Sequence, residues 1–168
     1  MNQNRNTNGR RSRYLGGIRS NEAVENETPP DEEWDDGWEE DDTEYIDVFV
    51  YGTLMKGYGN HFFLQNEVFL GYGETKPEYT FYNLGHFPAM VKGGDTSVRG
   101  EIYEVHPQTI EWLDKLEGVA EGLYERVEIT LDGSSPSGLT KVSTYILPRA
   151  NLEPRRDVPI KSGDWHKK

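Results

Sequence analysis

The sequence contains no cysteine. It therefore has no disulfide framework, no thiolate nucleophile and no thiolate metal ligand, which excludes several classes of redox protein and enzyme. Long apolar runs are also missing, since no stretch approaches the roughly 18 apolar residues that a membrane-spanning helix needs. No apolar segment follows the N-terminal arginines, as a secretory signal would require. We therefore expect a cytoplasmic protein with no membrane partner.

Motifs for metal, phosphate or serine-hydrolase chemistry are absent as well. The four histidines lie far apart and form no His-x-x-x-His pair, so the sequence gives no support for a metal site. It contains neither a Walker loop nor a Gly-x-Ser-x-Gly elbow. We predict no metal and no other cofactor, so any chemistry must come from carboxylates and backbone groups.

Charge is unevenly distributed along the 168 residues. Residues 1–20 hold five arginines and no acid, whereas residues 21–46 hold thirteen acids and no lysine or arginine. Residues 47–168 carry 13 basic and 17 acidic side chains, a modest net charge of −4. Because this part has no basic stripe that would displace counterions, nucleic acid is disfavoured as a partner.

The composition of residues 1–44 predicts a disordered tail, because their few apolar side chains cannot bury enough surface to offset the entropy of ordering. Within this tail, Trp34 and Trp38 stand four residues apart in an acidic run. Two interpretations stay open: a solvated tail that aids solubility, which is favoured, or a short motif that binds a protein partner through aromatic anchors. The folded domain is expected at 45–168.

Short apolar and β-branched segments predict a β-rich domain. Strands are expected at 46–51, 68–72, 79–82, 89–91, 98–105, 124–131 and 142–147. One helix should begin at Pro107 and stop at Gly118, and a second short helix is expected at 61–67. The fold class is therefore α+β, a small mixed β-barrel of about six strands with one or two flanking helices.

Two local features are candidates for chemistry. The segment 51–54 follows an apolar strand, and Gly52 permits a tight turn whose backbone N–H groups can converge on an anion. Glu117 stands at the C-terminal end of the predicted helix, where the macrodipole disfavours negative charge. Beside Leu116 and Val119, its pKa should be raised toward the neutral range that proton transfer needs. Position alone nevertheless favours the alternative of an ordinary surface glutamate.

Taken together, several strings resemble the gamma-glutamylcyclotransferase-like superfamily, in particular its gamma-glutamylamine cyclotransferase and AIG2-like branch. These strings are FVYGTLMKG at 49–57, Asn60-His61, VRGEIYEV at 98–105, LDKLEG at 113–118 and YER at 124–126. The resemblance covers about residues 47–147. It leaves the tail and the end Gly163-Asp164-Trp165 without an assigned role.

The resemblance implies a small β-barrel with flanking helices and a cofactor-independent enzyme acting on a small γ-glutamyl substrate. In such enzymes the α-amine of a γ-glutamyl group attacks its own γ-carbonyl, which releases 5-oxoproline and the free amine or amino acid. By motif matching, Glu117 would be the general base and acid. The substrate-binding residues would be Tyr51, Gly52, Thr53, Leu54 and Tyr124.

Within this resemblance, main-chain N–H groups of the turn would hold the substrate α-carboxylate, and Tyr124 would line the pocket or orient Glu117. A site role for Glu101 is less favoured, and Asp114 is expected to be structural. The alternative to an enzyme is a noncatalytic binding or regulatory module that uses the acidic tail as its interaction segment. The sequence leaves the leaving amine open, and loops 83–94 and 132–138 are expected to shape its pocket.

Overall fold

The structure is a computed structural model that describes residues 42–133, 138–153 and 157–168. These residues belong to one compact unit, 40–168. Nearly all of the tail predicted at 1–44, including Trp34 and Trp38, lies outside the described residues. Within the described ranges, no helix is long and apolar enough to cross a membrane.

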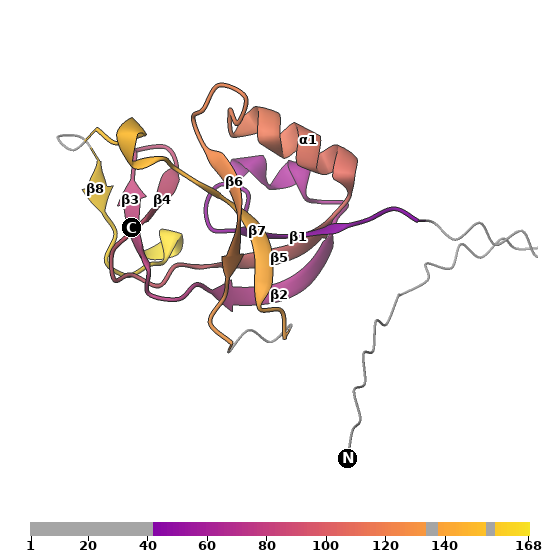
Figure 1. Cartoon of the computed structure of the whole chain (residues 1–168), viewed down its shortest axis with the longest axis horizontal. Helices are drawn as coiled ribbons and strands as arrows, with labels where there is room; N and C mark the ends of the chain where they lie inside the picture. Colours follow the sequence, from indigo (N-terminus) through magenta and orange to yellow (C-terminus); the bar gives the residue numbers. More distant parts are fainter. Residues whose placement is uncertain (1–41, 134–137, 154–156) are drawn as a thin grey trace, which may run out of the picture. The chain divides into compact units, whose positions relative to one another are not determined.

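Five strands form the larger sheet, in the order β2-β5-β1-β7-β6 (Figure 1). Their bounds are β1 Ile46–Val50, β2 Val68–Glu74, β5 Arg99–Val105, β6 Glu125–Thr130 and β7 Lys141–Ile146. The central strand β1 pairs antiparallel with β5 and parallel with β7. Its last three residues are fully buried, which explains why its sequence is a continuous apolar run instead of an alternating one.

The edge strands of this sheet approach each other at one end. Thr75, directly after β2, forms an isolated bridge with Leu131, directly after β6. The N–H of Asp132 also donates to the carbonyl oxygen of Glu74 at 2.8 Å. The five-stranded sheet therefore curls on itself, and its edges are joined at this bridge.

The smaller sheet contains β3 (Tyr79–Asn83), β4 (Pro88–Lys92) and β8 (Val158–Pro159), in the order β4-β3-β8. A tight turn joins β3 to β4, closed by a hydrogen bond from the N–H of Leu84 to the carbonyl oxygen of Phe87 at 3.0 Å. Just after β7, the N–H of Leu147 donates to the carbonyl oxygen of Met90 at 2.9 Å. This bond connects the smaller sheet to the end of the larger one.

The described part contains one α-helix, α1 (Pro107–Leu116), with Pro107 at its start and the His106 side chain as N-cap. Its buried face includes Ile110 and Leu113. The second helix expected at 61–67 is instead a short 3-10 helix, η1 (Gly59–Phe63), which lies beside α1. Two further 3-10 turns are η2 (Arg149–Asn151) and η3 (Trp165–Lys167).

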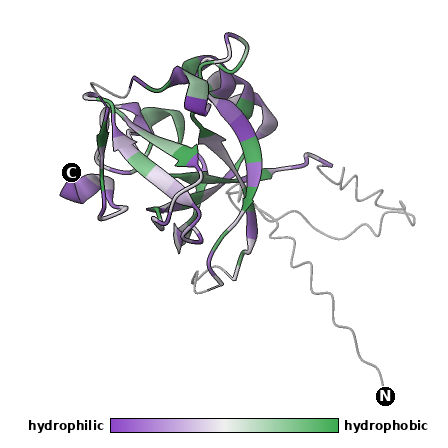
Figure 2. Cartoon of the chain, turned by 60° about the vertical axis from the view of Figure 1, so that its left-hand side comes forward, coloured by the Kyte–Doolittle hydropathy of each residue, from purple (hydrophilic) through white to green (hydrophobic). Residues whose placement is uncertain are grey.

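The C-terminal segment is anchored to the domain. The Trp165 side chain is 1% exposed, and the N–H of Arg99 donates to the carbonyl oxygen of Gly163 at 2.8 Å. A Cβ at Gly163 would collide with the carbonyl oxygen of Ser97, so the backbone can approach this closely only at glycine. Hydrophobic stretches lie on the strands of the domain, and the turn at the C-terminus is hydrophilic (Figure 2).

The predicted α+β class is confirmed, with one α-helix in the described part. The strands pair as a mixed five-stranded sheet and a three-stranded sheet, whereas the sequence predicted a single barrel of about six strands. Seven of the eight described strands lie where the sequence predicts them. The eighth, β8, has two residues and gives no periodic pattern to detect.

Candidate functional site

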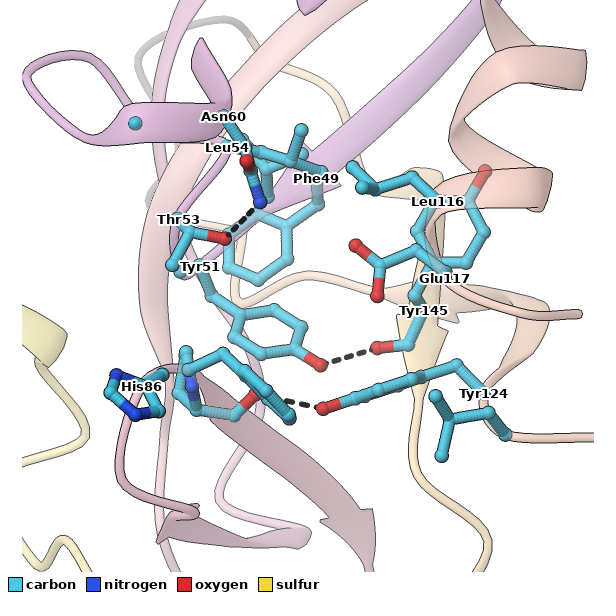
Figure 3. A pocket seen from close by; sticks show the side chains of 16 residues that line it. Phe49, Tyr51, Thr53, Leu54, Asn60, His86, Leu116, Glu117, Tyr124 and Tyr145 are labelled. Atoms are coloured by element: carbon cyan, nitrogen blue, oxygen red, sulfur yellow. Dashed lines mark hydrogen bonds between the residues drawn. The ribbon is translucent and has the colours of Figure 1, made fainter.

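A cavity of about 450 Å³ lies where the end of β1, the β3–β4 turn and the end of α1 meet (Figure 3). Its volume is in the range of roughly 300–1,000 Å³ that is typical of small-molecule sites. All six residues that the sequence selects line it. The described lining residues are Phe49, Val50, Tyr51, Gly52, Thr53, Leu54, Gly59, Asn60, His86, Phe87, Pro88, Leu116, Glu117, Leu123, Tyr124 and Tyr145.

The turn after β1 forms one wall of this cavity. The N–H of Asn60 donates to the carbonyl oxygen of Thr53 at 3.1 Å, and the Asn60 side-chain amide donates to the Thr53 hydroxyl at 3.0 Å. Among the backbone bonds outside helices and strands in the described ranges, none is donated by the N–H of Gly52, Thr53 or Leu54. Successive free N–H groups of this kind can bind an anion.

Gly52 allows the β3–β4 turn to pack directly against this wall. A Cβ at Gly52 would lie 2.6 Å from Cγ of Pro88, far inside van der Waals contact. The requirement for glycine here is therefore close approach between two chain segments.

Glu101 stabilises the turn through hydrogen bonds. One of its carboxylate oxygens accepts hydrogen bonds from the N–H of Lys56 at 2.9 Å and from the hydroxyl of Tyr103 at 2.7 Å. The side chain does not line the cavity, and its residue is 5% exposed. Two charge-assisted hydrogen bonds to a buried carboxylate give it a positioning role next to the candidate anion site.

Glu117 lies across the cavity from this turn, and its carboxylate points into the open space (Figure 3). It is the C-cap of α1, held by its N–H donating to the carbonyl oxygen of Leu113 at 2.9 Å. Burial raises the pKa of Glu117 from 4.5 to about 7. No group in the described part of the chain donates a hydrogen bond to its carboxylate. The sequence predicted a pKa raised by the helix end and by apolar neighbours. In the structure the pKa is raised, and burial is the cause.

Three tyrosine hydroxyls stand close to Glu117, and each donates to another acceptor. Burial is the main cause that raises their pKa values, and the nearby Glu117 raises them further. These tyrosines therefore stay protonated at neutral pH. The bonds are from Tyr51 to the carbonyl oxygen of Tyr145 at 2.6 Å, from Tyr124 to the carbonyl oxygen of Pro88 at 3.1 Å and from Tyr145 to Asp114 Oδ1 at 2.8 Å.

Tyr124 thus lines the cavity, but its hydroxyl proton is committed to Pro88 and is not directed at Glu117. Asp114 also forms an ion pair with Arg126, with Nε and Oδ1 3.0 Å apart, so this carboxylate links α1 to β6. Among the described residues, no group of three or more His, Asp or Glu side chains is placed to hold a metal ion.

Sequence reasoning did not select several lining residues, notably Phe87, Leu123 and Tyr145. Phe87 falls in the loop 83–94, which was expected to shape the pocket. None of the described residues of the other expected loop, 132–138, lines the cavity. In the sequence, Leu123 directly precedes an expected strand and Tyr145 lies within one. Neither shows a pattern that distinguishes a cavity-lining residue from an ordinary core residue.

Comparison with known proteins identifies relatives over the same region. The family described as "Gamma-glutamyl cyclotransferase, AIG2-like" matches residues 48–167. A Vibrio cholerae protein provisionally named as a gamma-glutamylcyclotransferase is 43% identical over 118 residues, which cover 70% of this chain and 93% of that protein. The Escherichia coli K12 "Gamma-glutamylcyclotransferase family protein YtfP" is 35% identical, with coverage of 70% and 94%.

Two solved structures are also similar to this chain. The crystal structure of an AIG2-like protein from Mus musculus matches with a TM-score of 0.56 at 26% identity, covering 67% of this chain and 82% of that one. An uncharacterized protein from Pyrococcus horikoshii matches with a TM-score of 0.57 at 30% identity, covering 71% and 89%. The family match extends through the anchored C-terminal segment. The chain therefore belongs to the AIG2-like gamma-glutamylcyclotransferase family.

Proposed function

We propose that this protein is a cyclotransferase that converts a γ-glutamyl amine or γ-glutamyl amino acid into 5-oxoproline and the free amine. One observation carries the proposal: free backbone N–H groups and a half-buried Glu117, whose pKa is raised to about 7, face each other across one cavity. Membership of the family supports the choice of a γ-glutamyl substrate. We assign the reaction to the domain at residues 45–168 and place the protein in the cytoplasm. The tail takes part in no step of the proposed reaction.

The turn 52–54 would bind the α-carboxylate of the γ-glutamyl group. Its free N–H groups supply hydrogen-bond donors to an anion without introducing a positive side chain. Gly52 and Leu54 are buried, so this carboxylate would sit at the closed end of the cavity. Tyr51 precedes the turn and lines the same wall.

Glu117 would move the proton in both halves of the reaction. The substrate ammonium must lose a proton before its nitrogen can attack, and ionised Glu117 accepts that proton. The nitrogen then forms a bond to the γ-carbonyl carbon, and the bond from this carbon to the leaving nitrogen breaks. Protonated Glu117 returns the proton to the leaving nitrogen. The attacking nitrogen must also lose a second proton to become the lactam N–H, and this proton passes to the released amine, which leaves as an ammonium ion. The cycle therefore consumes no net proton.

A carboxyl group whose pKa lies near 7 suits this double role. At neutral pH its ionised form is a stronger base than that of an ordinary glutamate, and a large fraction of the group is protonated and can act as an acid. Attack within one molecule needs no second substrate. The protein therefore contributes mainly the folded-back conformation of the γ-glutamyl chain and the proton transfer.

The test is a reaction of the purified protein with γ-glutamyl-ε-lysine. Lysine and 5-oxoproline should appear in equal amounts, and Glu117→Gln should abolish their release. Glu121→Gln is the matched control, since Glu121 is exposed and does not line the cavity. Absence of 5-oxoproline from γ-glutamyl-ε-lysine, γ-glutamyl-alanine and glutathione alike would refute the proposal and favour a noncatalytic binding module.

A further inference from the structure

Hydrogen bonds to carbonyl groups fix the orientation of the candidate anion-binding turn after β1. The N–H of Met55 donates to the carbonyl oxygen of Gly52 at 3.0 Å, and the N–H of Asn60 donates to that of Thr53 at 3.1 Å. The N–H and C=O of one trans peptide unit point in opposite directions. These two bonds therefore also determine where the N–H groups of Thr53 and Leu54 point, which are the groups that the proposed function assigns to the substrate α-carboxylate.

His61 fixes the third carbonyl group of this turn. Its Nδ1 lies 3.1 Å from the carbonyl oxygen of Leu54. Because a carbonyl oxygen can only accept a hydrogen bond, Nδ1 carries the proton and donates it. The N–H of the same peptide unit belongs to Met55, and it closes the turn onto Gly52. The bond from His61 therefore holds the peptide unit on which closure of the turn depends.

His61 contacts the turn from outside the cavity. Its neighbours Gly59 and Asn60 on η1 line the cavity, whereas His61 is not among the described lining residues. Its ring centroid lies 5.9 Å from that of Tyr103, whose hydroxyl donates to Glu101 at 2.7 Å. His61 thus packs beside the residues that already stabilise the turn. Any contribution that it makes to the reaction must act through the turn and not through contact with the substrate.

We infer that His61 is a positioning residue that holds the turn 52–54 in the geometry that binds the α-carboxylate of a γ-glutamyl substrate. The inference rests on the proposed function. Donors that are already aligned need no reorganisation when the anion binds. Without the bond from His61, the peptide unit between Leu54 and Met55 is free to rotate, so substrate binding must also order the turn and becomes weaker. His61 therefore acts on KM and leaves proton transfer by Glu117 unchanged.

Two substitutions separate the hydrogen bond of His61 from its packing. Phenylalanine keeps an aromatic ring beside Tyr103 but has no donor. Asparagine lacks the ring, and its side-chain amide places an N–H donor close to the position of Nδ1. If the hydrogen bond positions the turn, His61→Phe is the damaging change. If the ring matters only for packing, His61→Asn is the damaging change.

Steady-state kinetics of the full chain with γ-glutamyl-ε-lysine test this contrast, and urea unfolding checks that each variant is folded under the assay conditions. His61→Phe should raise KM about tenfold and change kcat by less than about twofold. His61→Asn should return KM to within about threefold of the wild-type value. Phe62→Ala is the matched control, since Phe62 follows His61 on η1, is 55% exposed and is not among the described lining residues. It should leave KM and kcat unchanged.

The outcomes separate this inference from the proposed function. A raised KM in His61→Phe that His61→Asn restores supports the positioning role. An unchanged KM in His61→Phe, a change confined to kcat, or a higher KM in His61→Asn than in His61→Phe overturns the positioning role and leaves the cyclotransferase intact. Failure of His61→Phe to fold overturns it as well, because the role of His61 is then structural. Failure of the wild-type protein to release 5-oxoproline overturns the proposed function, and the positioning role with it.

Discussion

Replacement of Glu117 by glutamine should stabilise the fold in a pH-dependent way. Burial raises the pKa of Glu117 from 4.5 to about 7, so the folded state binds its proton more tightly than the unfolded state. The stability that this proton contributes is fully present below pH of about 4.5 and is lost as the pH rises through about 7. At higher pH the wild-type protein must keep a carboxylate charged in a half-buried site.

The size of the effect follows from the shift in pKa. With about 1.4 kcal/mol for each pKa unit, ionised Glu117 lowers the free energy of unfolding by about 3 kcal/mol at pH 8 and by less than about 1 kcal/mol at pH 5. Glutamine has nearly the same shape and does not titrate. The free energy of unfolding of Glu117→Gln, minus that of the wild type, should therefore increase by about 2 kcal/mol or more between pH 5 and pH 8.

Urea unfolding at both pH values measures this difference, provided that the slope against denaturant is the same for both proteins. Glu121→Gln serves as the control, and its difference from the wild type should not change with pH in this way. A Glu117→Gln difference that is constant from pH 5 to pH 8, or one that shrinks, would refute the raised pKa. It would also remove the physical basis for using this acid near neutral pH.

Two further substitutions test the wall that faces Glu117. Gly52→Ala places a Cβ 2.6 Å from Cγ of Pro88, so the turn or the β3–β4 hairpin must move. KM for a γ-glutamyl substrate should therefore rise at least about tenfold. An unchanged KM would contradict the close packing of Gly52 against Pro88. Glu101→Gln weakens the hydrogen bonds to Lys56 and Tyr103 and should lower the free energy of unfolding by about 1–3 kcal/mol. Steady-state kinetics and urea unfolding measure these effects, and a Glu101→Gln protein as stable as the wild type would exclude a positioning role.

Much of the fold follows from local sequence signals. The central strand β1 is recognisable because its apolar run is buried on both faces, and α1 because Pro107 and Gly118 bracket a periodic apolar face. Partition of the strands into two sheets is a property of long-range pairing. It depends on pairings such as that of Tyr82 in β3 with Pro159 in β8, which residue types in either segment do not encode.

The candidate site likewise has features that local sequence patterns predict and features that depend on the three-dimensional structure. A turn after an apolar strand and an acid at a helix end are local patterns, and both were found in the sequence. The cavity is lined by several separate segments, so Phe87 and Leu123 come to share it with Glu117 only in three dimensions. The raised pKa was expected from position in the chain, whereas its cause, burial by surrounding segments, required the structure.

The most direct test of the account is the rate at which Glu117→Gln forms 5-oxoproline from γ-glutamyl-ε-lysine at pH 8, compared with the wild type and Glu121→Gln. Loss of a positioned acid–base group should lower kcat by about 10² to 10⁴-fold, while the variant remains folded. Turnover by Glu117→Gln within about threefold of the wild type would contradict the assignment of proton transfer to this residue.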